Sequence, residues 1–239
     1  MLTKTPLHDQ IAERLAKRWP NWSQITDRYS KSKAYEHLLH CARKSEIPLG
    51  NFAGHIAETH LRVALEEICK ELGAQDRVVF DPIKSGSSGK YFQFYTDKEE
   101  RLFAVAPNGT DYSEMDEPML IDGVPTLFEI RIKNSHGGRK HNMMSHSRFM
   151  SEDHVNYVLA PLRDYFNTPQ GAFVFIIPPA SVKENETAQA FKERGGLLVP
   201  FYKNRHDYRC DVERLLRDLK YKKYYGWQPF KDLLPQEAV

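Results

Sequence analysis

Cysteine is scarce in this sequence: Cys41, Cys69 and Cys210 are its three cysteines among 239 residues. None belongs to a CxxC pair, so neither a zinc ribbon nor a dithiol redox motif is indicated. Isolated cysteines of this kind are typical of small buried side chains in a reducing compartment. We therefore expect all three to be reduced and buried.

Long apolar runs are also missing. No stretch approaches the roughly 20 apolar residues that a membrane-spanning helix needs. The first residues, MLTKTPLHDQIAERL, do not show the basic and then apolar run of a secretion signal. We therefore expect a cytoplasmic protein that has no membrane partner.

Several catalytic signatures are absent as well. The sequence has no GxSxG elbow and no glycine-rich dinucleotide fingerprint. The segment KSGSSGK at 84–90 contains glycine and lysine, but not with the spacing of a phosphate-binding P-loop. Serine hydrolases, dehydrogenases and P-loop enzymes are therefore disfavoured.

Charge is present but unevenly distributed. The net charge is +2, yet residues 1–50 carry nine basic against five acidic residues, and residues 201–239 carry nine against six. The central residues 51–200 are therefore net acidic. Basic ends around an acidic centre suit a polyanion that is held at the flanks of a metal site. The alternative interpretation is that these charges belong to solvated helix faces.

Apolar periodicity predicts helices over about 7–19, 31–44 and 52–72. Residues 1–48 are interpreted as a helical N-terminal extension, and residues 49–239 as the main domain with a basic C-terminal helix. The later strands and helices are expected in the order 78–80, 91–95, 102–106, 111–133, 152–166, 172–177, 182–194, 197–202 and 207–223. This order predicts an α/β protein with a central mixed β-sheet flanked by helices.

The most informative segment is an acidic hairpin predicted within 111–133. Asp122–Gly123 between two β-rich runs is a strong signal for a two-residue turn. With that turn, Asp116 faces Glu129, and directly opposed side chains have Cβ atoms about 4.5–5.5 Å apart. Two carboxylates this close repel each other, and a divalent cation is the simplest compensation. A slip of one residue would break this arrangement.

Alternation along the second strand separates two faces. The core-facing set is Phe128, Ile130 and Ile132, and the polar set is Glu129, Arg131 and Lys133. The alternative is a half-exposed sheet whose polar face is only solvated.

Glu58 falls at the start of the apolar stripe of the helix over 52–72. A carboxylate at such a position is costly unless it is paired or bound to a metal. The alternative is a glutamate near the helix start that reaches solvent.

A helix with Glu, a strand that begins with Asp and a strand with E-x-K together resemble the core of the PD-(D/E)XK nuclease superfamily. Here these elements are GHIAETHL (54–61), EMDEPMLIDG (114–123) and FEIRIK (128–133). The order of elements in that family, helix, three strands, helix and strand, is similar to the order expected from 52 to 177. The resemblance covers about half of the chain.

The resemblance implies a role for each matching residue. Asp116 and Glu129 would bind Mg²⁺ or Mn²⁺, and Glu58 would assist them. The lysine of E-x-K is replaced by Arg131, which binds phosphate well but is a poor proton acceptor. Lys133 lies on the same face and is the next candidate for that lysine's role.

The resulting expectation is a Mg²⁺-dependent endonuclease that hydrolyses DNA phosphodiester bonds, of a restriction, repair or junction type. Because such folds often cut duplexes as dimers, a homodimer is also expected. The alternative, which rests on Arg131, is a nucleic-acid-binding protein with a nuclease-like fold and a degenerate active site. A third alternative is a structural subunit that retains the fold but not the metal.

Two segments are candidates for contacts with nucleic acid. In the loop at 136–149, Arg139 and Lys140 could bind phosphates. In KYKKYYGW at 220–227, the basic residues Lys220, Lys222 and Lys223 alternate with aromatic residues, a mixture that suits base stacking with phosphate contacts. The alternatives are a plain surface loop and aromatic residues that dock the last helix.

Overall fold

The computed structural model describes residues 1–44, 47, 49–82, 93–96, 102–105, 111–132, 147, 149–178 and 186–218. Within these ranges, residues 43, 93–96, 102–105, 111–115 and 218 are described by their backbone alone. None of the helices in this part of the chain combines the length and the apolar character that crossing a bilayer requires.

Three helices precede a long fourth one: α1 (Pro6–Leu15), α2 (Trp22–Tyr29), α3 (Lys33–Arg43) and α4 (Leu49–Glu71). The helix predicted over 7–19 ends early, and Trp19, expected on its buried stripe, is 64% exposed and stacks on Tyr202. The sequence pattern does not predict α2. Asn21 caps the start of this helix, because its side chain accepts the N–H of Ser23 at 3.0 Å. The sequence signal for α2 is therefore a capping residue and not an apolar pattern.

The central sheet has five strands in the order β1-β5-β6-β7-β8. These are β1 (Val78–Phe80), β5 (Glu117–Ile121), β6 (Val124–Ile130), β7 (Ala172–Ile177) and β8 (Leu197–Pro200). β1, β5 and β6 pair antiparallel, whereas β7 and β8 run parallel to β6. With α4 and α6 (Glu152–Tyr165) they follow the order helix, three strands, helix and strand, so the predicted α/β class with a mixed sheet is confirmed.

A second, three-stranded antiparallel sheet is inserted between β1 and β5. It consists of β2 (Gln93–Thr96), β3 (Leu102–Val105) and β4 (Asp111–Met115). The sequence predicts strands here, but the apolar pattern does not indicate that they leave the central sheet. Because β4 ends at Met115 and β5 begins at Glu117, Asp116 forms the link between the two sheets.

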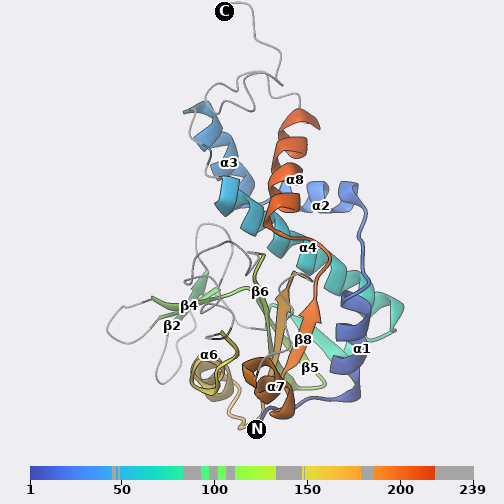
Figure 1. Cartoon of the computed structure of the whole chain (residues 1–239), viewed down its shortest axis with the longest axis vertical. Helices are drawn as coiled ribbons and strands as arrows, with labels where there is room; N and C mark the ends of the chain where they lie inside the picture. The colour runs from blue at the N-terminus through green and yellow to red at the C-terminus, as the bar shows by residue number, and fades with distance from the viewer. Residues whose placement is uncertain are drawn as a thin grey trace, which may run out of the picture.

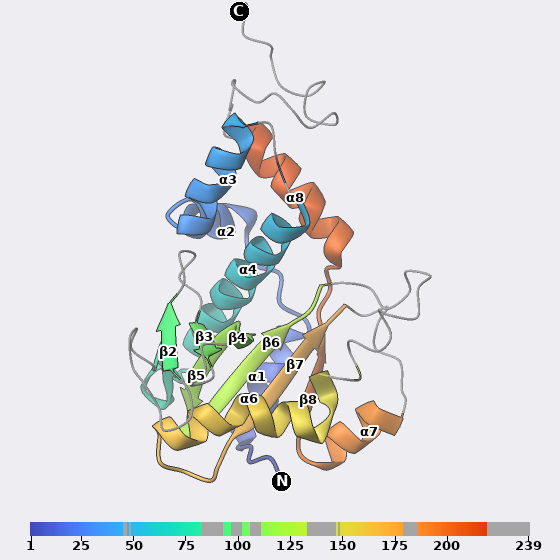
Figure 2. The ribbon, with the colours of Figure 1, turned by 90° about the vertical axis from the view of Figure 1, so that its left-hand side faces the viewer.

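Helices cover both faces of the central sheet (Figures 1 and 2). α1, α4 and α8 (Arg205–Asp218) share an apolar core with one face, and α6 and α7 (Glu186–Glu193) pack on the other. Phe128 and Ile130 lie in the core on the α4 face, as predicted, whereas Glu129 on the other face is buried beside an apolar core and does not belong to a wholly polar face. All seven residues of β6 are buried, because α6 and α7 close a second core over that face.

The hairpin of β5 and β6 has the predicted two-residue turn. Asp122 and Gly123 have positive φ angles of 53° and 76°, as a type I′ turn requires. The ladder pairs Glu117 with Phe128, which confirms the predicted register. This ladder ends one step before Asp116 and Glu129.

Two side chains from outside the hairpin hold its turn. Arg77 donates hydrogen bonds to the Asp122 carboxylate at 2.7 and 2.9 Å, and the hydroxyl of Thr5 donates another at 2.6 Å. The guanidinium beside it lowers the pKa of Asp122. These contacts tie the hairpin tip to the starts of α1 and β1, and they oppose a slip of register.

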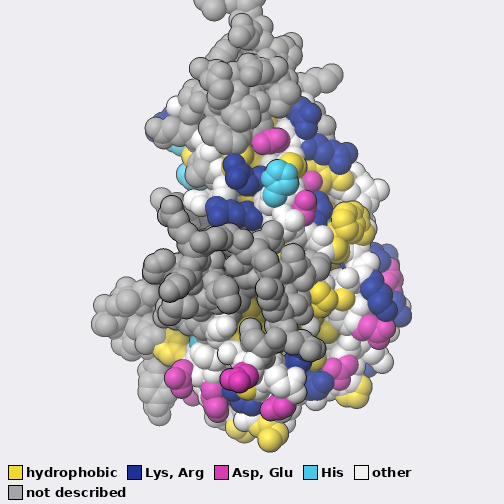
Figure 3. Space-filling model, in the orientation of Figure 1, with side chains coloured by type: hydrophobic (Ala, Val, Ile, Leu, Met, Phe, Trp, Pro, Cys, Tyr) yellow, Lys and Arg dark blue, Asp and Glu magenta, His cyan; other side chains and the backbone are white. Residues whose placement is uncertain are grey.

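α8 packs along α4 and leaves its other side open to solvent (Figure 1). Cys210 lies on that open side and is exposed, so the expectation that all three cysteines are buried is wrong. Cys69 in α4 is buried, and Cys41 in α3 is half-buried. Lys and Arg side chains gather around α8 on the face drawn in Figure 3.

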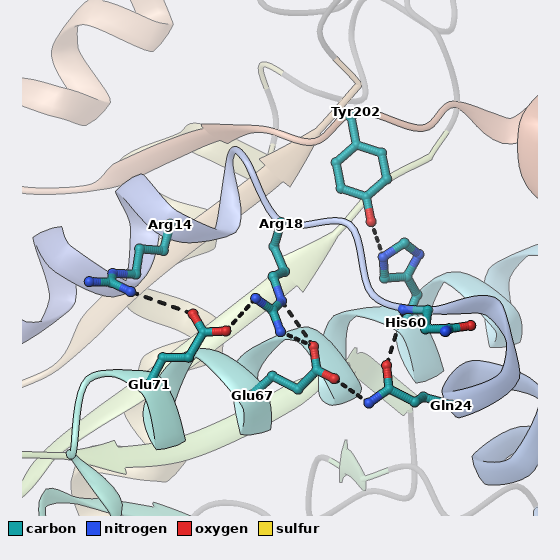
Figure 4. A network of polar contacts seen from close by, with 8 residues as sticks. Arg14, Arg18, Gln24, His60, Glu67, Glu71 and Tyr202 are labelled. Atoms are coloured by element: carbon teal, nitrogen blue, oxygen red, sulfur yellow. Dashed lines mark hydrogen bonds and ion pairs between the residues drawn. The ribbon is translucent and has the colours of Figure 1, made fainter.

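Polar contacts join the N-terminal helices to α4 (Figure 4). The guanidinium of Arg18 pairs with both Glu67 and Glu71, and Arg14 lies 3.5 Å from Glu71. Gln24 from α2 donates a hydrogen bond to Glu67. The helices of the predicted N-terminal extension therefore pack on α4 and the central sheet. They share one apolar core with them and are also joined to α4 by these polar pairs.

Two histidines are buried in this body as neutral rings. Nδ1 of His8 accepts the backbone N–H of Thr5 at 2.9 Å, so its Nε2–H donates to the Thr126 hydroxyl at 2.9 Å. His60 lies between the hydroxyls of Tyr202 and Tyr208. Burial lowers the pKa of His8 to about 4 and that of His60 to about 3.

These two histidines predict a stability that decreases in mild acid. The unfolded chain protonates each ring near pH 6.5, whereas the folded chain resists protonation until lower pH. The free energy of unfolding should therefore fall below pH 6.5, by about 1.4 kcal/mol per pH unit for each histidine. Urea titrations at several pH values measure this slope. His60→Gln should reduce the slope, and the exposed control His206→Gln should not; equal slopes for all three proteins would contradict the assignment.

Candidate active site

Three acidic residues and one arginine predicted from the sequence come together where α4, β5 and β6 meet. Asp116 precedes β5, and its carboxylate accepts the backbone N–H of Ile130 at 2.7 Å. Glu129 lies near the end of β6, and Arg131 directly follows that strand. Glu58 comes from α4, and its charge raises the pKa of Glu129 and that of Arg131. The predicted association of Asp116, Glu129, Glu58 and Arg131 therefore has a structural basis.

Glu129 is the most deeply buried member of this cluster. It is 3% exposed and pairs with Phe175 of β7 in the ladder. Its carboxylate forms an ion pair with the guanidinium of Arg131 through Oε1. Burial, and next the charges of Asp116 and Glu58, raise the pKa of Glu129 well above its usual range. The cluster thus holds its central carboxylate under electrostatic strain.

Arg131 supplies the positive charge at the centre of the cluster. Burial lowers the pKa of its guanidinium, but Glu129, Asp116 and Glu58 raise it more, so this group remains charged. The guanidinium lies over the ring of Phe149, 4.3 Å from its centroid. Its Nε is buried and has no hydrogen-bond partner among the described residues, while the side chain as a whole is 33% exposed.

Glu58 is accompanied by a histidine that the sequence pattern does not single out. Nδ1 of His55 lies 3.6 Å from Oε2 of Glu58, one turn earlier on α4. The i,i+3 spacing was the available signal, because residues three apart share a helix face. Among the described residues, a Cβ added at Gly54 would meet Glu58 Oε1, at 3.8 Å.

The donor chemistry of the cluster fits a hard divalent cation. Carboxylate oxygens are the ligands that Mg²⁺ and Mn²⁺ prefer, and Asp116, Glu129 and Glu58 carry them. In the described ranges, however, no three His, Cys, Asp or Glu side chains are arranged to hold a metal ion. The guanidinium of Arg131 is the group that lies against Glu129.

The remaining predicted site residues lie outside the described part of the chain. They are Lys133, the two basic residues of the loop at 136–149 and the three lysines of the segment at 220–227. In full, these residues are Lys133, Arg139, Lys140, Lys220, Lys222 and Lys223.

A second charged network fixes the frame of the site. Arg62 of α4 donates two hydrogen bonds to Asp81, at 2.8 and 2.7 Å, one to Glu66 at 2.7 Å and one to Glu117 at 3.2 Å. Burial raises the pKa of Glu117 to about 8, although the guanidinium opposes this shift. The network joins α4 to the start of β5, next to Asp116. Sequence spacing does not reveal it, because Arg62 and Glu117 are 55 residues apart.

Arg205 is a further cation near the end of β6. Its backbone N–H donates to the carbonyl of Ile132 at 2.7 Å, one residue beyond Arg131. Its guanidinium rests on Gly50, where an added Cβ would overlap it. Arg205 has no ion pair with any described residue. The basic composition of the C-terminal helix was the signal in the sequence that could have indicated it.

Comparisons with known proteins identify no family. No family model matches the sequence, and no curated protein matches it. Among solved structures, the crystal structure of protein VC1899 from Vibrio cholerae is similar at 13% identity, over 91% of this chain and 57% of that chain, with a TM-score of 0.29. This chain therefore spans little more than half of that protein, and the likeness carries no argument about fold or function.

The Arg62 network predicts a large effect on stability. Arg62→Met should lower the free energy of unfolding by about 3 kcal/mol, because it removes the hydrogen bonds to Asp81 and Glu66 and leaves the buried carboxyl of Glu117 without its donor. The double variant Arg62→Met, Glu117→Met should recover much of this loss. Arg28→Gln is the matched control, since Arg28 also pairs with Glu66 but is half-exposed, and its effect should stay below about 1 kcal/mol. Urea unfolding measures all three, and equal losses for Arg62→Met and Arg28→Gln would contradict the role of Arg62.

Proposed function

We propose that this protein is a metal-dependent endonuclease that hydrolyses DNA phosphodiester bonds. The proposal is carried by one observation: the register of the β5–β6 hairpin brings Asp116 beside the end of β6, next to the buried Glu129 and its partner Arg131. Carboxylates grouped around one guanidinium suit a cation and a phosphate ester as joint ligands. The resemblance to the PD-(D/E)XK superfamily, carried by the same residues, supports the same activity.

Each residue of the cluster has a role in this proposal. A bound Mg²⁺ or Mn²⁺ would supply Lewis-acid polarisation of a phosphate oxygen and acidify a water molecule. Asp116, oriented by the Ile130 N–H, and Glu129, fixed in β6, would hold this ion, and Glu58 would assist them. Arg131 binds a phosphate oxygen and stabilises the negative charge that grows there during hydrolysis. A guanidinium cannot accept a proton at neutral pH, so the water loses its proton to a different group.

A second candidate function is nucleic-acid binding without cleavage. The ion pair of Arg131 with Glu129 favours it, because the guanidinium already provides a positive charge at the buried carboxylate. In this case the cluster would hold the fold together, and the bound DNA would need no metal. A cytoplasmic location and a homodimer complete both proposals.

The first test is metal-dependent cleavage. Duplex, forked and junction DNA should be cut in the presence of Mg²⁺ or Mn²⁺ and not in EDTA. Asp116→Ala and Glu129→Gln should each reduce the rate by about 100-fold or more, because each removes a group that acts on the transition state. Asp27→Asn, which changes an exposed acid on α2, should retain full activity.

The outcomes separate the candidates. Binding of DNA that is never cut, under any of these conditions, would favour the second candidate. If the protein neither binds nor cuts DNA, both candidate functions are contradicted. Circular dichroism of each variant shows whether a loss of activity reflects the site or the fold.

Arg205 provides a separate prediction about the substrate surface. It lies beside the site and has no acidic partner among the described residues, so we expect it to bind a DNA phosphate. Arg205→Gln should weaken DNA binding and reduce the slope of log Kd against log salt by about 0.9. Fluorescence anisotropy with Ca²⁺ in place of Mg²⁺ measures this. Lys17→Gln, an equal change of charge at an exposed position, is the control, and identical behaviour of the two variants would exclude a role for Arg205.

A further inference from the structure

Trp19 is an exposed aromatic side chain whose ring is supported from one side. It lies in the link between α1 and α2 and is 64% exposed. Its indole stacks on the ring of Tyr202, with centroids 3.7 Å apart and an interplanar angle of 24°. A ring that is stacked on one face can be this exposed only if its opposite face is open. Trp19 therefore presents a flat apolar surface to solvent.

The support beneath this surface is tied to the core. The hydroxyl of Tyr202 lies against Nε2 of His60, a buried side chain of α4 (Figure 4). Phe201, the neighbour of Tyr202 in the chain, is itself buried in the core. Because Tyr202 is fixed in this way, the indole that rests on it loses little conformational freedom when a ligand stacks on its open face.

Positively charged groups lie beside the indole. Nζ of Lys203 lies between two tryptophans, 5.9 Å from the ring centroid of Trp19 and 6.0 Å from that of Trp22. The guanidinium of Arg214, an exposed side chain of α8, lies 5.2 Å from the Trp22 centroid. Asp211 pairs with Lys203 and also attracts Arg214. An open aromatic face and an exposed guanidinium thus belong to one surface.

This surface is separate from the candidate active site. His60 of α4 faces Tyr202, whereas Glu58 of the same helix belongs to the acidic cluster. Residues two apart on an α-helix point about 200° apart, so the two surfaces lie on different sides of α4. The residues of the second surface, called the aromatic platform below, are Trp19, Trp22, Tyr202, Lys203 and Arg214.

The chemistry of the platform favours an unpaired nucleotide. The faces of bases in a duplex are covered by their neighbours, whereas a single strand can place its bases on aromatic rings. Cations beside such rings bind the phosphates that connect the bases. A proline-rich peptide also docks on aromatic side chains, but it brings no negative charge for Arg214. Charge complementarity therefore selects the nucleic acid.

We propose that the aromatic platform binds single-stranded nucleic acid, with a base stacked on Trp19 and a phosphate beside Arg214. It is a second binding surface that holds a strand without cutting it, and it does not depend on the proposed hydrolytic activity. Base faces and phosphates are common to DNA and RNA, so strands of both kinds should bind.

The first test is fluorescence anisotropy in EDTA with labelled oligo(dT) and oligo(U) of about 12 nucleotides, within the usual range of site sizes. Trp19→Ala should weaken the binding of each by about 10-fold, as expected for the loss of one stacked base. Trp19→Phe should retain most of the affinity, because it retains a ring. Val79→Ala is the matched control, since it shortens another exposed apolar side chain, and it should bind like the natural protein.

Tryptophan emission reports the stacking contact directly. Oligo(dT) should quench the emission of the natural protein, and most of this quenching should be absent in Trp19→Phe, although that variant still binds. Trp22 and Trp227 remain in the variant as internal references. Quenching that persists unchanged in Trp19→Phe would place the contact at another tryptophan and would overturn the proposal.

A salt titration tests the cationic part of the platform. Arg214→Gln should reduce the slope of log Kd against log salt by about 0.7 for the single strand, because one phosphate contact is lost. Lys192→Gln, an equal change of charge at an exposed position of α7, should leave the slope unchanged. Identical slopes for the two variants would remove Arg214 from the surface.

Duplex DNA distinguishes stacking from a change of fold. Trp19→Ala should weaken single-strand binding more than duplex binding, since a duplex offers no open base face. Equal weakening of both, or equal affinity of Trp19→Ala and the natural protein for the oligonucleotides, would overturn the proposal. Absence of oligonucleotide binding at low salt would also overturn it and would leave a protein partner for this surface. Because these measurements contain no metal, they remain decisive whether or not the protein cuts DNA.

Discussion

The candidate site depends on one local constraint, the two-residue turn at Asp122–Gly123. Side chains alternate between the faces of a strand, so a slip of one residue would turn Glu129 and Arg131 together to the α4 face. The turn lies about 20 Å from the site, at the other end of β6. The contacts of Arg77 and Thr5 with Asp122 therefore control, at a distance, which residues can meet at the far end of the strand.

The parts of this structure that were predictable from the sequence are those with local signals. The hairpin follows from an Asp–Gly turn and period-two alternation, and α4 from an apolar stripe that ends at Gly73, where φ is positive. Once the register was fixed, the neighbourhood of Asp116 and Glu129 followed from counting. Arg62 and Arg205 could not be found in this way, because their contacts depend on how α4 and α8 pack on the sheet. The second core over β6 was hidden for a related reason: charged residues on a strand suggest solvent, whereas α6 and α7 cover that face.

The burial of Glu129 has no explanation in the stability of the fold. A carboxylate in an apolar environment costs several kcal/mol unless it is well paired. An apolar side chain at this position would extend the core that already contains Leu127 and Phe175. Carboxylates whose pKa is raised by burial and by neighbouring acids are concentrated at functional sites. The position of Glu129 is therefore consistent with a functional role rather than with a contribution to stability.

The two arginine clusters differ in the number of hydrogen bonds that each guanidinium forms. Arg62 and Arg131 each lie among carboxylates near Asp116, but Arg62 is 13% exposed and donates well-formed hydrogen bonds to three of them. Arg131 pairs with one carboxylate, that of Glu129, and its Nε has no hydrogen-bond partner among the described residues. A satisfied buried network makes a structure rigid, whereas an unsatisfied one remains costly until a ligand completes it. Arg62 thus holds β5 against α4 and fixes the frame in which Glu129 and Arg131 form their ion pair.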